Sequence, residues 1–268
     1  MLAHGSEWKL CVRYSAYRLT SVIKPNNRSP LKNMHHEHYI KQNKLLAVLP
    51  KEELRSLTPY LELVLLDSGE TLAESNKCSN FAYFPIDSTI SLYYRLESGE
   101  VSKITMVGNE GMFSVAHIMG GETLPYFASI ETTGHAFRIE RSVLKKEFLR
   151  VAALRQTLLL YSQAAMTQMA QTAVCGRHHT LNQQLCLHLL LVHDNSLSDD
   201  FVLTHEAIAH MLGVRREGVT TAAGKLREDG LIDYRRGHIK VVDRSGLEKQ
   251  CCECYQVVHR EFYRLLGY

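Results

Sequence analysis

The chain has 268 residues, of which 45% are hydrophobic and 22% are charged. This composition is typical of a globular protein with one large or two ordinary domains. The formal net charge is only +3, so the overall charge does not by itself indicate binding to nucleic acid. Evidence for such binding must come from where the charged residues are concentrated. No run of about 18 apolar residues predicts a membrane span, and no apolar signal segment opens the chain. We therefore expect no membrane partner and a cytoplasmic location.

Cysteine usage agrees with that compartment. The seven cysteines are odd in number and scattered, which favours reduced thiols over a disulfide framework. They are Cys11, Cys78, Cys175, Cys186, Cys251, Cys252 and Cys254.

Residues 1–42 are expected to be a flexible N-terminal extension. The segment Lys24–Pro30 is polar and broken by prolines, as in a linker. Residues 1–33 are either such an extension or the product of an upstream translation start, and Met34 opens a segment more typical of a domain. The run His35–His38 has metal-ligand chemistry, but beside such an arm we expect solvated histidines.

Residues 43–141 predict a small antiparallel β-barrel or sandwich. Two short amphipathic helices, separated at Pro50, come first. Short segments of strand character follow, with turn residues between them, as in double-sheet or barrel folds. The expected strands are Glu62–Leu66, Phe81–Pro85, Thr89–Leu96, Val101–Val107, Ala128–Thr132 and His135–Ile139.

Residues 142–175 predict one long helix, because no proline or glycine interrupts them and apolar residues recur at steps of three and four. Apolar residues such as Leu159 and Met166 widen the stripe beyond one face. A small barrel could not cover such a helix alone, so we expect a dimerisation helix, with an ordinary intrachain helix as the alternative. Gly176 should end it, and a second helix should start near Thr180.

Residues 176–268 predict a winged helix-turn-helix domain. Thr204 is a good N-cap for a first helix, Gly213 suits the tight turn, and a second helix is expected over Arg215–Glu228. Two short strands, Leu231–Tyr234 and Ile239–Val242, should then form the wing hairpin.

Local charge supports DNA binding by this segment. Arg215 and Arg216 open the second helix, and Arg235 and Arg236 lie at the wing tip. Arginine can bind guanine and glutamate can accept from cytosine, so Arg216 and Glu217 are the expected base-reading pair. Thr220 and Thr221 are short enough to contact phosphate or a thymine methyl group, and Thr204 completes the predicted set. The alternative is a solvated charged helix without a ligand.

These segments resemble the Crp/Fnr family of bacterial transcription regulators. The resemblance covers about residues 43–266 and rests on Thr204–Ala209, Leu212–Val219, Asp67–Glu70, Tyr83–Pro85 and Val107–Met112. It implies an α+β protein with a cyclic-nucleotide-binding-like jelly roll, a long dimerisation helix and a C-terminal DNA reader. It also implies that Arg216 and Glu217 touch bases. Thr221 stands where relatives often have an arginine, which leaves the operator sequence open.

The effector is not expected to be cyclic AMP. The family's Gly-Glu-Leu-Gly motif reads Gly108–Gly111 here, and no arginine for the cyclic phosphate lies between Gly108 and Ala136. Too few N-terminal cysteines are present for an iron–sulfur sensor. Haem sensing stays open, since one histidine or methionine can be an axial ligand.

The thiols of Cys251, Cys252 and Cys254 are expected to pack as small apolar side chains. A redox sensor or a metal site is the alternative, but zinc would need a second ligand pair, and only His259 stands nearby. His178 and His179 are expected at an interdomain hinge, beside a helix C-terminus. We predict no cofactor and no metal.

The sequence thus predicts a homodimeric regulator that binds a pseudo-palindromic operator in double-stranded DNA, with RNA polymerase as a further partner. The alternative is a ligand-binding or protein-interaction module with a remnant helix-turn-helix. No nucleophile elbow, phosphate loop or metalloprotease motif is present, so we expect no enzyme activity.

Overall fold

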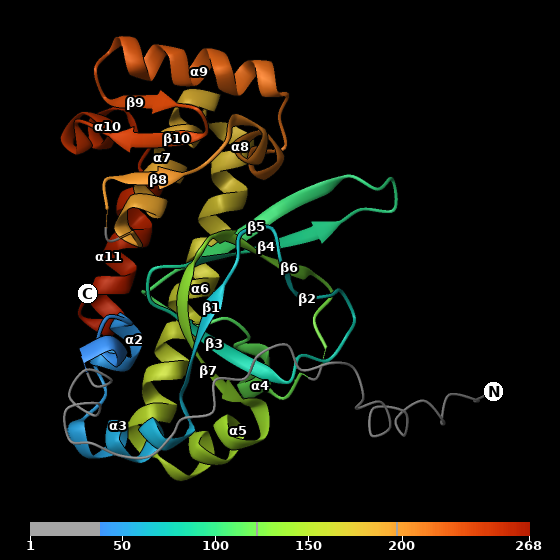
Figure 1. The fold of residues 1–268 in the computed structure, drawn as a ribbon, viewed down its shortest axis with the longest axis vertical. Coiled ribbons are helices and arrows are strands. Elements are labelled where there is room, and N and C mark those ends of the chain that lie inside the picture. Colours follow the sequence, from blue (N-terminus) through green and yellow to red (C-terminus); the bar gives the residue numbers. More distant parts are fainter. Residues whose placement is uncertain (1–37, 122, 197) are drawn as a thin grey trace. The chain divides into compact units, whose positions relative to one another are not determined.

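The computed structural model describes residues 38–121, 123–196 and 198–268. The predictions for Cys11, residues 1–33 and His35–Glu37 lie outside the described residues. Residues 39–268 form one compact unit (Figure 1). Ile40 is already fully buried in its core, so the packed structure begins slightly before residue 43.

Seven strands build the predicted double-sheet barrel, and every pairing in it is antiparallel. One sheet has the order β1-β7-β3 and the other β2-β6-β4-β5. The strand β2 was not predicted, because three residues are too short for a recognisable alternation. The strands are β1 (Glu62–Leu66), β2 (Thr71–Ala73), β3 (Phe81–Pro85), β4 (Thr89–Arg95), β5 (Val101–Val107), β6 (Phe127–Thr132) and β7 (Gly134–Glu140).

Short helices close the barrel. They are α2 (Lys44–Ala47), α3 (Lys51–Leu57), η2 (Thr58–Tyr60) and α4 (Ala116–Met119). The predicted break at Pro50 is confirmed, since this residue is the N-cap of α3. Asn43 caps α2 and its buried amide donates to the carbonyls of Pro85 and Gly111, both at 2.9 Å. This one side chain therefore fixes α2 to the end of β3 and to the loop after β5.

The predicted single helix over residues 142–175 is wrong in its bounds. The structure has α5 (Arg141–Arg150) and α6 (Ala152–His178), separated at Val151, whose backbone is extended (φ −103°, ψ 109°). Gly176 does not end α6, which continues to His178. The space beside Gly176 is open, so no close contact requires a glycine there. Leu158 and Tyr161 on the inner face of α6 are buried against the barrel core.

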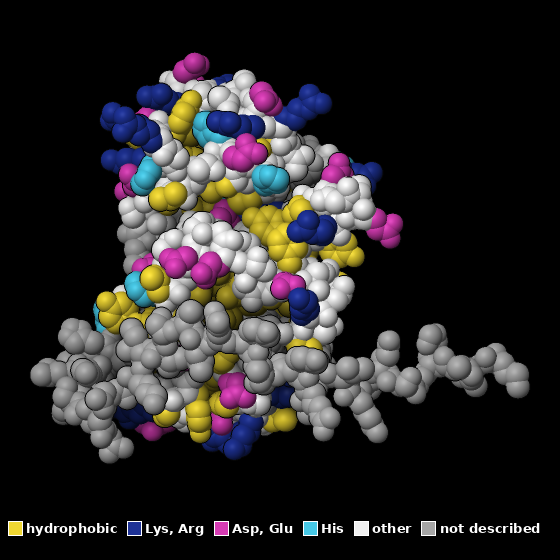
Figure 2. All heavy atoms as spheres, turned by 45° about the vertical axis from the view of Figure 1, so that its right-hand side comes forward, with side chains coloured by type: hydrophobic (Ala, Val, Ile, Leu, Met, Phe, Trp, Pro, Cys, Tyr) yellow, Lys and Arg dark blue, Asp and Glu magenta, His cyan; other side chains and the backbone are white. Residues whose placement is uncertain are grey.

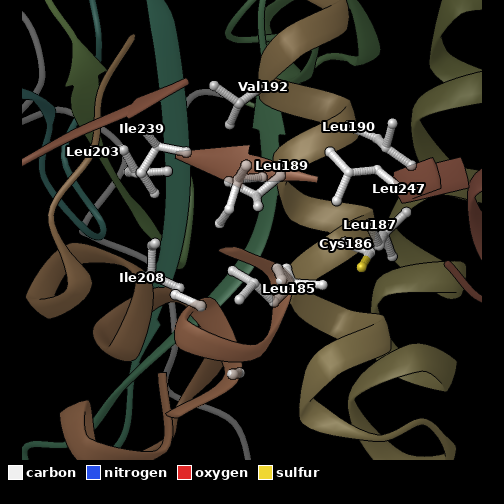
Figure 3. Packing of buried hydrophobic residues seen from close by; sticks show 14 of the residues in the cluster. Leu185, Cys186, Leu187, Leu189, Leu190, Val192, Leu203, Ile208, Ile239 and Leu247 are labelled. Atoms are coloured by element: carbon white, nitrogen blue, oxygen red, sulfur yellow. The ribbon is translucent and has the colours of Figure 1, made fainter. Parts of the chain in front are cut away.

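The C-terminal segment contains the predicted winged helix-turn-helix. Its elements are α7 (Leu181–Asp194), β8 (Asp200–Val202), α8 (His205–Leu212), α9 (Arg216–Glu228), β9 (Ile232–Arg235), β10 (His238–Val241), α10 (Arg244–Gln250) and α11 (Cys254–Leu266). Thr180 caps α7 through a capping box with Gln183. Leu185 and Leu189 of α7, Ile208 of α8 and Ile239 of β10 meet in its core (Figure 3).

The last helix departs from the expected division of the chain. Val258 and Phe262 of α11 pack with Leu158 and Tyr161 of α6, in the same buried cluster as the barrel residues. A helix that follows the wing thus returns to the central helix. The predicted domain boundaries 43–141 and 176–268 stay a prediction.

A buried ionic group joins the barrel to α7. Lys103 of β5 lies 3.0 Å from Glu131 of β6, and His188 of α7 lies 3.3 Å from the second carboxylate oxygen of Glu131. All three side chains are at most 7% exposed. Buried charges need such partners, so this group ties the two parts together. Among the described helices, none is long and apolar enough to span a membrane.

Candidate DNA interface

The helix-turn-helix has the local geometry that its sequence predicts. The Thr204 hydroxyl accepts from the backbone N–H of Ala207 at 3.1 Å and so caps α8. Gly213 has φ 64°, which glycine adopts without strain, and Val214 continues the turn by donating to Ala209. Arg215 is the N-cap of α9. The turn thus presents the first residues of α9 at the surface.

The outer face of α9 carries the predicted base-reading residues. Arg215, Arg216, Glu217, Thr220 and Thr221 are all exposed, whereas the inner face is buried. The hydroxyls of Thr220 and Thr221 donate to the carbonyls four residues earlier, at 3.1 and 3.0 Å. Each hydroxyl oxygen can still accept, so both threonines remain suitable for polar contacts.

Arg216 is only weakly held by the protein. Its Nε lies 3.9 Å from a carboxylate oxygen of Glu206, and these side chains are 67% and 62% exposed. An exposed pair at this distance contributes little stability. The guanidinium can therefore leave Glu206 for a DNA base at small cost.

The wing hairpin turns through Arg236 and Gly237, with φ 52° and 85°. Positive φ angles at both central residues define a type I′ turn, whose twist matches that of the two strands in a hairpin with a two-residue loop. The strands pair with Arg235 opposite His238, one residue away from the predicted bounds. The unpredicted strand β8 pairs with β10 and makes the wing a three-stranded sheet.

One groove brings α8, the start of α9 and the wing tip together. Thr204, Arg216 and Arg236 all line it, which unites three of the eight predicted residues. Arg215 and Glu217, with Arg216 again, line a neighbouring hollow beside the β4–β5 hairpin. Lys and Arg side chains are spread over this end of the molecule (Figure 2).

Two histidines of this surface were not predicted. His205 and His238 line the same groove, and His205 Nδ1 lies 3.2 Å from the Thr220 hydroxyl. Burial and the nearby Arg216 charge lower the pKa of His205, so the ring is neutral at neutral pH. The sequence signal that could have identified His205 is its position directly after the predicted N-cap Thr204.

Two further basic residues of this segment serve the fold. Arg227 pairs with Asp233 at 3.0 Å and stacks over the Tyr234 ring. Arg244 contacts Asp194 and donates to the Tyr255 hydroxyl, both at 2.6 Å. Their positive charge is thereby engaged within the protein.

The segment Gly108–Gly111, which the resemblance matches to the family's Gly-Glu-Leu-Gly motif, packs against other parts of the chain. Both carboxylate oxygens of Glu110 accept from the backbone N–H of Gly108 at 3.0 Å. Tyr161 of α6 donates to the carbonyl of Met112 at 3.0 Å, and a side chain at Gly111 would collide with its ring. Glu110 therefore does not face a ribose in this arrangement.

The cysteine run after α10 has partners that sequence spacing did not indicate. Cys252 and Cys254 lie beside Cys175 and His179 at the end of α6. His259, the one candidate ligand noted near the run, is not in this group. Cys175 and His179 are more than 70 residues away from the run in the sequence, so spacing alone does not indicate them.

Comparison with known proteins supports the same reading of the fold. Residues 183–250 match the Crp-like helix-turn-helix domain family. The Global nitrogen regulator of Synechococcus elongatus is 24% identical over 220 residues, which are 78% of this chain and 97% of that protein. The transcriptional regulator LdrP of Thermus thermophilus is 23% identical over 170 residues, covering 59% of this chain and 86% of LdrP.

Solved structures share the fold. FixK2 from Bradyrhizobium japonicum superposes with a TM-score of 0.61 at 14% identity, covering 72% of this chain and 98% of FixK2. TTHB099, a transcriptional regulator of the CRP family from Thermus thermophilus, gives 0.58 at 18% identity over 70% and 95% of the two chains. Residues 183–250 therefore contain a Crp-like helix-turn-helix domain, and the chain as a whole shares its fold with FixK2 and TTHB099 and is similar in sequence to two transcription regulators.

Proposed function

We propose that the chain is a homodimeric, sequence-specific regulator that reads DNA bases with Arg216 and Glu217. The observation that carries this proposal is the exposure of both residues in the first turn of α9, beside a groove that Arg236 also lines. A recognition helix presents its N-terminal residues to base edges in the major groove. Arg215, Arg235, Thr204, Thr220 and Thr221 would then contact the DNA backbone around this pair.

Dimerisation is supported by the outer face of α6. Leu159 and Met166 are 51% and 57% exposed, and they are seven residues apart. The exposed Ala152 and Ala173 continue the same spacing in both directions. Residues seven apart lie on one side of a helix, so these four form an exposed apolar row that a second copy of α6 can cover. Two recognition helices could then enter successive major grooves about 34 Å apart on a pseudo-palindromic operator.

The dimer can be tested by one substitution with a matched control. Met166→Glu should convert the dimer to a monomer, as measured by sedimentation velocity. Leu149→Glu replaces an apolar side chain of α5 that is 68% exposed and should leave the mass unchanged. A Met166→Glu protein that sediments as a dimer would contradict the proposed seam.

The proposed effector is not cyclic AMP. This proposal is supported by the Glu110 carboxylate, which accepts from Gly108, and by the absence of Lys and Arg from residues 108–136 of the sequence. RNA polymerase is the proposed protein partner, because a regulator bound beside a promoter meets it there.

The DNA-binding function can be tested by selecting bound fragments from a genomic library with the purified chain. Arg216→Glu should abolish binding to the selected duplex, because it places a negative charge against guanine and phosphate. Arg260→Glu makes the same charge change on the exposed face of α11 and should preserve sequence-specific binding. Equal binding by wild type and Arg216→Glu would favour the alternative, a ligand-binding or protein-interaction module with a remnant helix-turn-helix.

A further inference from the structure

Four metal-ligating side chains from two distant segments converge where α6 ends. They are Cys175 and His179 from the end of α6, and Cys252 and Cys254 from the link between α10 and α11. Their ligand atoms all lie within 4.8 Å of one another. Cys175 and Cys252 are separated by 77 positions in the sequence, so only the fold brings them together.

Two ligand-atom distances match those around one tetrahedral ion. Zinc–sulfur bonds of about 2.3 Å and zinc–nitrogen bonds of about 2.0–2.1 Å place tetrahedral ligands about 3.8 Å apart for two sulfurs and about 3.6 Å for sulfur and nitrogen. The Sγ atoms of Cys175 and Cys252 are 3.5 Å apart, and Cys254 Sγ is 3.5 Å from His179 Nδ1. In a [4Fe–4S] cluster the ligands bind different irons and so lie farther apart than atoms that share one ion.

The surroundings suit a closed structural site. The three cysteines are at most 4% exposed, and the His179 side chain is 14% exposed. The second ring nitrogen of His179, Nε2, lies 3.3 Å from a carboxylate oxygen of Glu253. A carboxylate behind a metal-binding histidine fixes the ring and its tautomer, so Nδ1 would point to the ion.

We propose that Cys175, His179, Cys252 and Cys254 form a structural zinc(II) site with Glu253 as the carboxylate behind His179. The set of three cysteines and one histidine is one that structural zinc sites use. His179 is the C-cap of α6 and directly precedes Thr180, the N-cap of α7. The ion would therefore fasten the hinge between the central helix and the DNA-binding segment to the link between α10 and α11.

The first experiment measures metal bound to the full-length chain after gel filtration, by elemental mass spectrometry. About one zinc per chain is expected, since the four ligands complete one tetrahedral site. Cobalt(II) added to wild-type chain stripped of metal should give the intense visible bands of tetrahedral thiolate coordination. Stripped wild type that binds neither ion would overturn the site, as would iron with acid-labile sulfide or a Cys175–Cys252 disulfide in freshly purified protein.

Variants assign the ligands. Cys175→Ser and Cys252→Ser should lose the stoichiometric zinc, whereas Cys186→Ser and Cys251→Ser should keep it, because those two thiols are not in the group. Should the ligand variants fail to fold, the cobalt spectrum of wild type still decides the matter. Equal zinc in Cys175→Ser and wild type would overturn the assignment.

The role of Glu253 has its own readout. Its side chain is 75% exposed, so Glu253→Gln should fold normally. Zinc affinity, measured by competition with a chromophoric chelator, should fall by about 10- to 100-fold, as for other carboxylates behind a metal-bound histidine. Unchanged affinity would overturn the part assigned to Glu253.

Discussion

Loss of the Glu131 charge should be among the most destabilising single changes in the barrel. Burial acts to raise the pKa of Glu131, but Lys103 and His188 outweigh it and hold that pKa well below its usual range, so the carboxylate is ionised. Glu131→Gln would leave the Lys103 ammonium, whose side chain is 7% exposed, without a counter-charge. Breaking such a buried pair costs about 3–5 kcal/mol.

Urea denaturation measures this cost as a fall in the midpoint with an unchanged slope. Glu62→Gln is the matched control, because Glu62 and Arg138 also pair at 2.9 Å across barrel strands but are 43% and 26% exposed. That exposed pair should contribute only about 0–1 kcal/mol. The double variant Lys103→Met with Glu131→Leu should be more stable than Glu131→Gln, since no charge is left buried. A Glu131→Gln protein within about 1 kcal/mol of wild type would show that the Glu131 charge does not stabilise the buried Lys103.

Three further predictions concern pH, the wing and the helix cap. Burial and the Lys103 charge lower the pKa of His188, so below an ordinary histidine pKa of about 6.5 the unfolded chain takes up a proton that the folded chain does not. The free energy of unfolding should therefore fall as pH drops from 7 to 5, and His188→Gln should flatten that slope in urea denaturation. Arg236→Gly should raise the melting temperature, because Arg236 has φ 52° and a left-handed conformation costs a non-glycine residue about 1 kcal/mol. The same substitution should weaken DNA binding, since it removes a positive charge from the wing. A stabilised variant with wild-type affinity would contradict a role for Arg236 in DNA binding. Thr204→Ala should lower the free energy of unfolding by about 1 kcal/mol, because it removes the N-cap of α8, whereas Thr204→Ser should keep the cap. Equal melting temperatures for Thr204→Ala and wild type would contradict a stabilising role for this cap.

The helix-turn-helix could be predicted because its determinants are local. Thr204 and Gly213 each act within a few residues, as an N-cap and as a position with positive φ. A short stretch of sequence therefore contains the information that positions α8, α9 and the wing. The exposed positions of Arg216 and Glu217 follow from the same pattern, since the apolar residues of α9 must face inward.

Other features depend on contacts between distant segments and could not be predicted. The helix breaks at Val151 although the sequence around it is favourable for a helix, and it continues through Gly176, a residue that often ends one. The strand β8 has three residues and depends on pairing with β10. Likewise, Cys175 and His179 meet Cys252 and Cys254 only when α11 returns to α6.

Base reading by Arg216 is the core of the proposed function. Equilibrium binding of wild type and Arg216→Ala to a selected operator and to its single-base-pair variants, at fixed salt, measures it. We expect Arg216→Ala to lose about 1–3 kcal/mol of discrimination at one base pair in each half-site and to keep its preference elsewhere. Uniformly weaker binding to all duplexes, with the preference at every position unchanged, would show that Arg216 contacts only the DNA backbone and would contradict the claim.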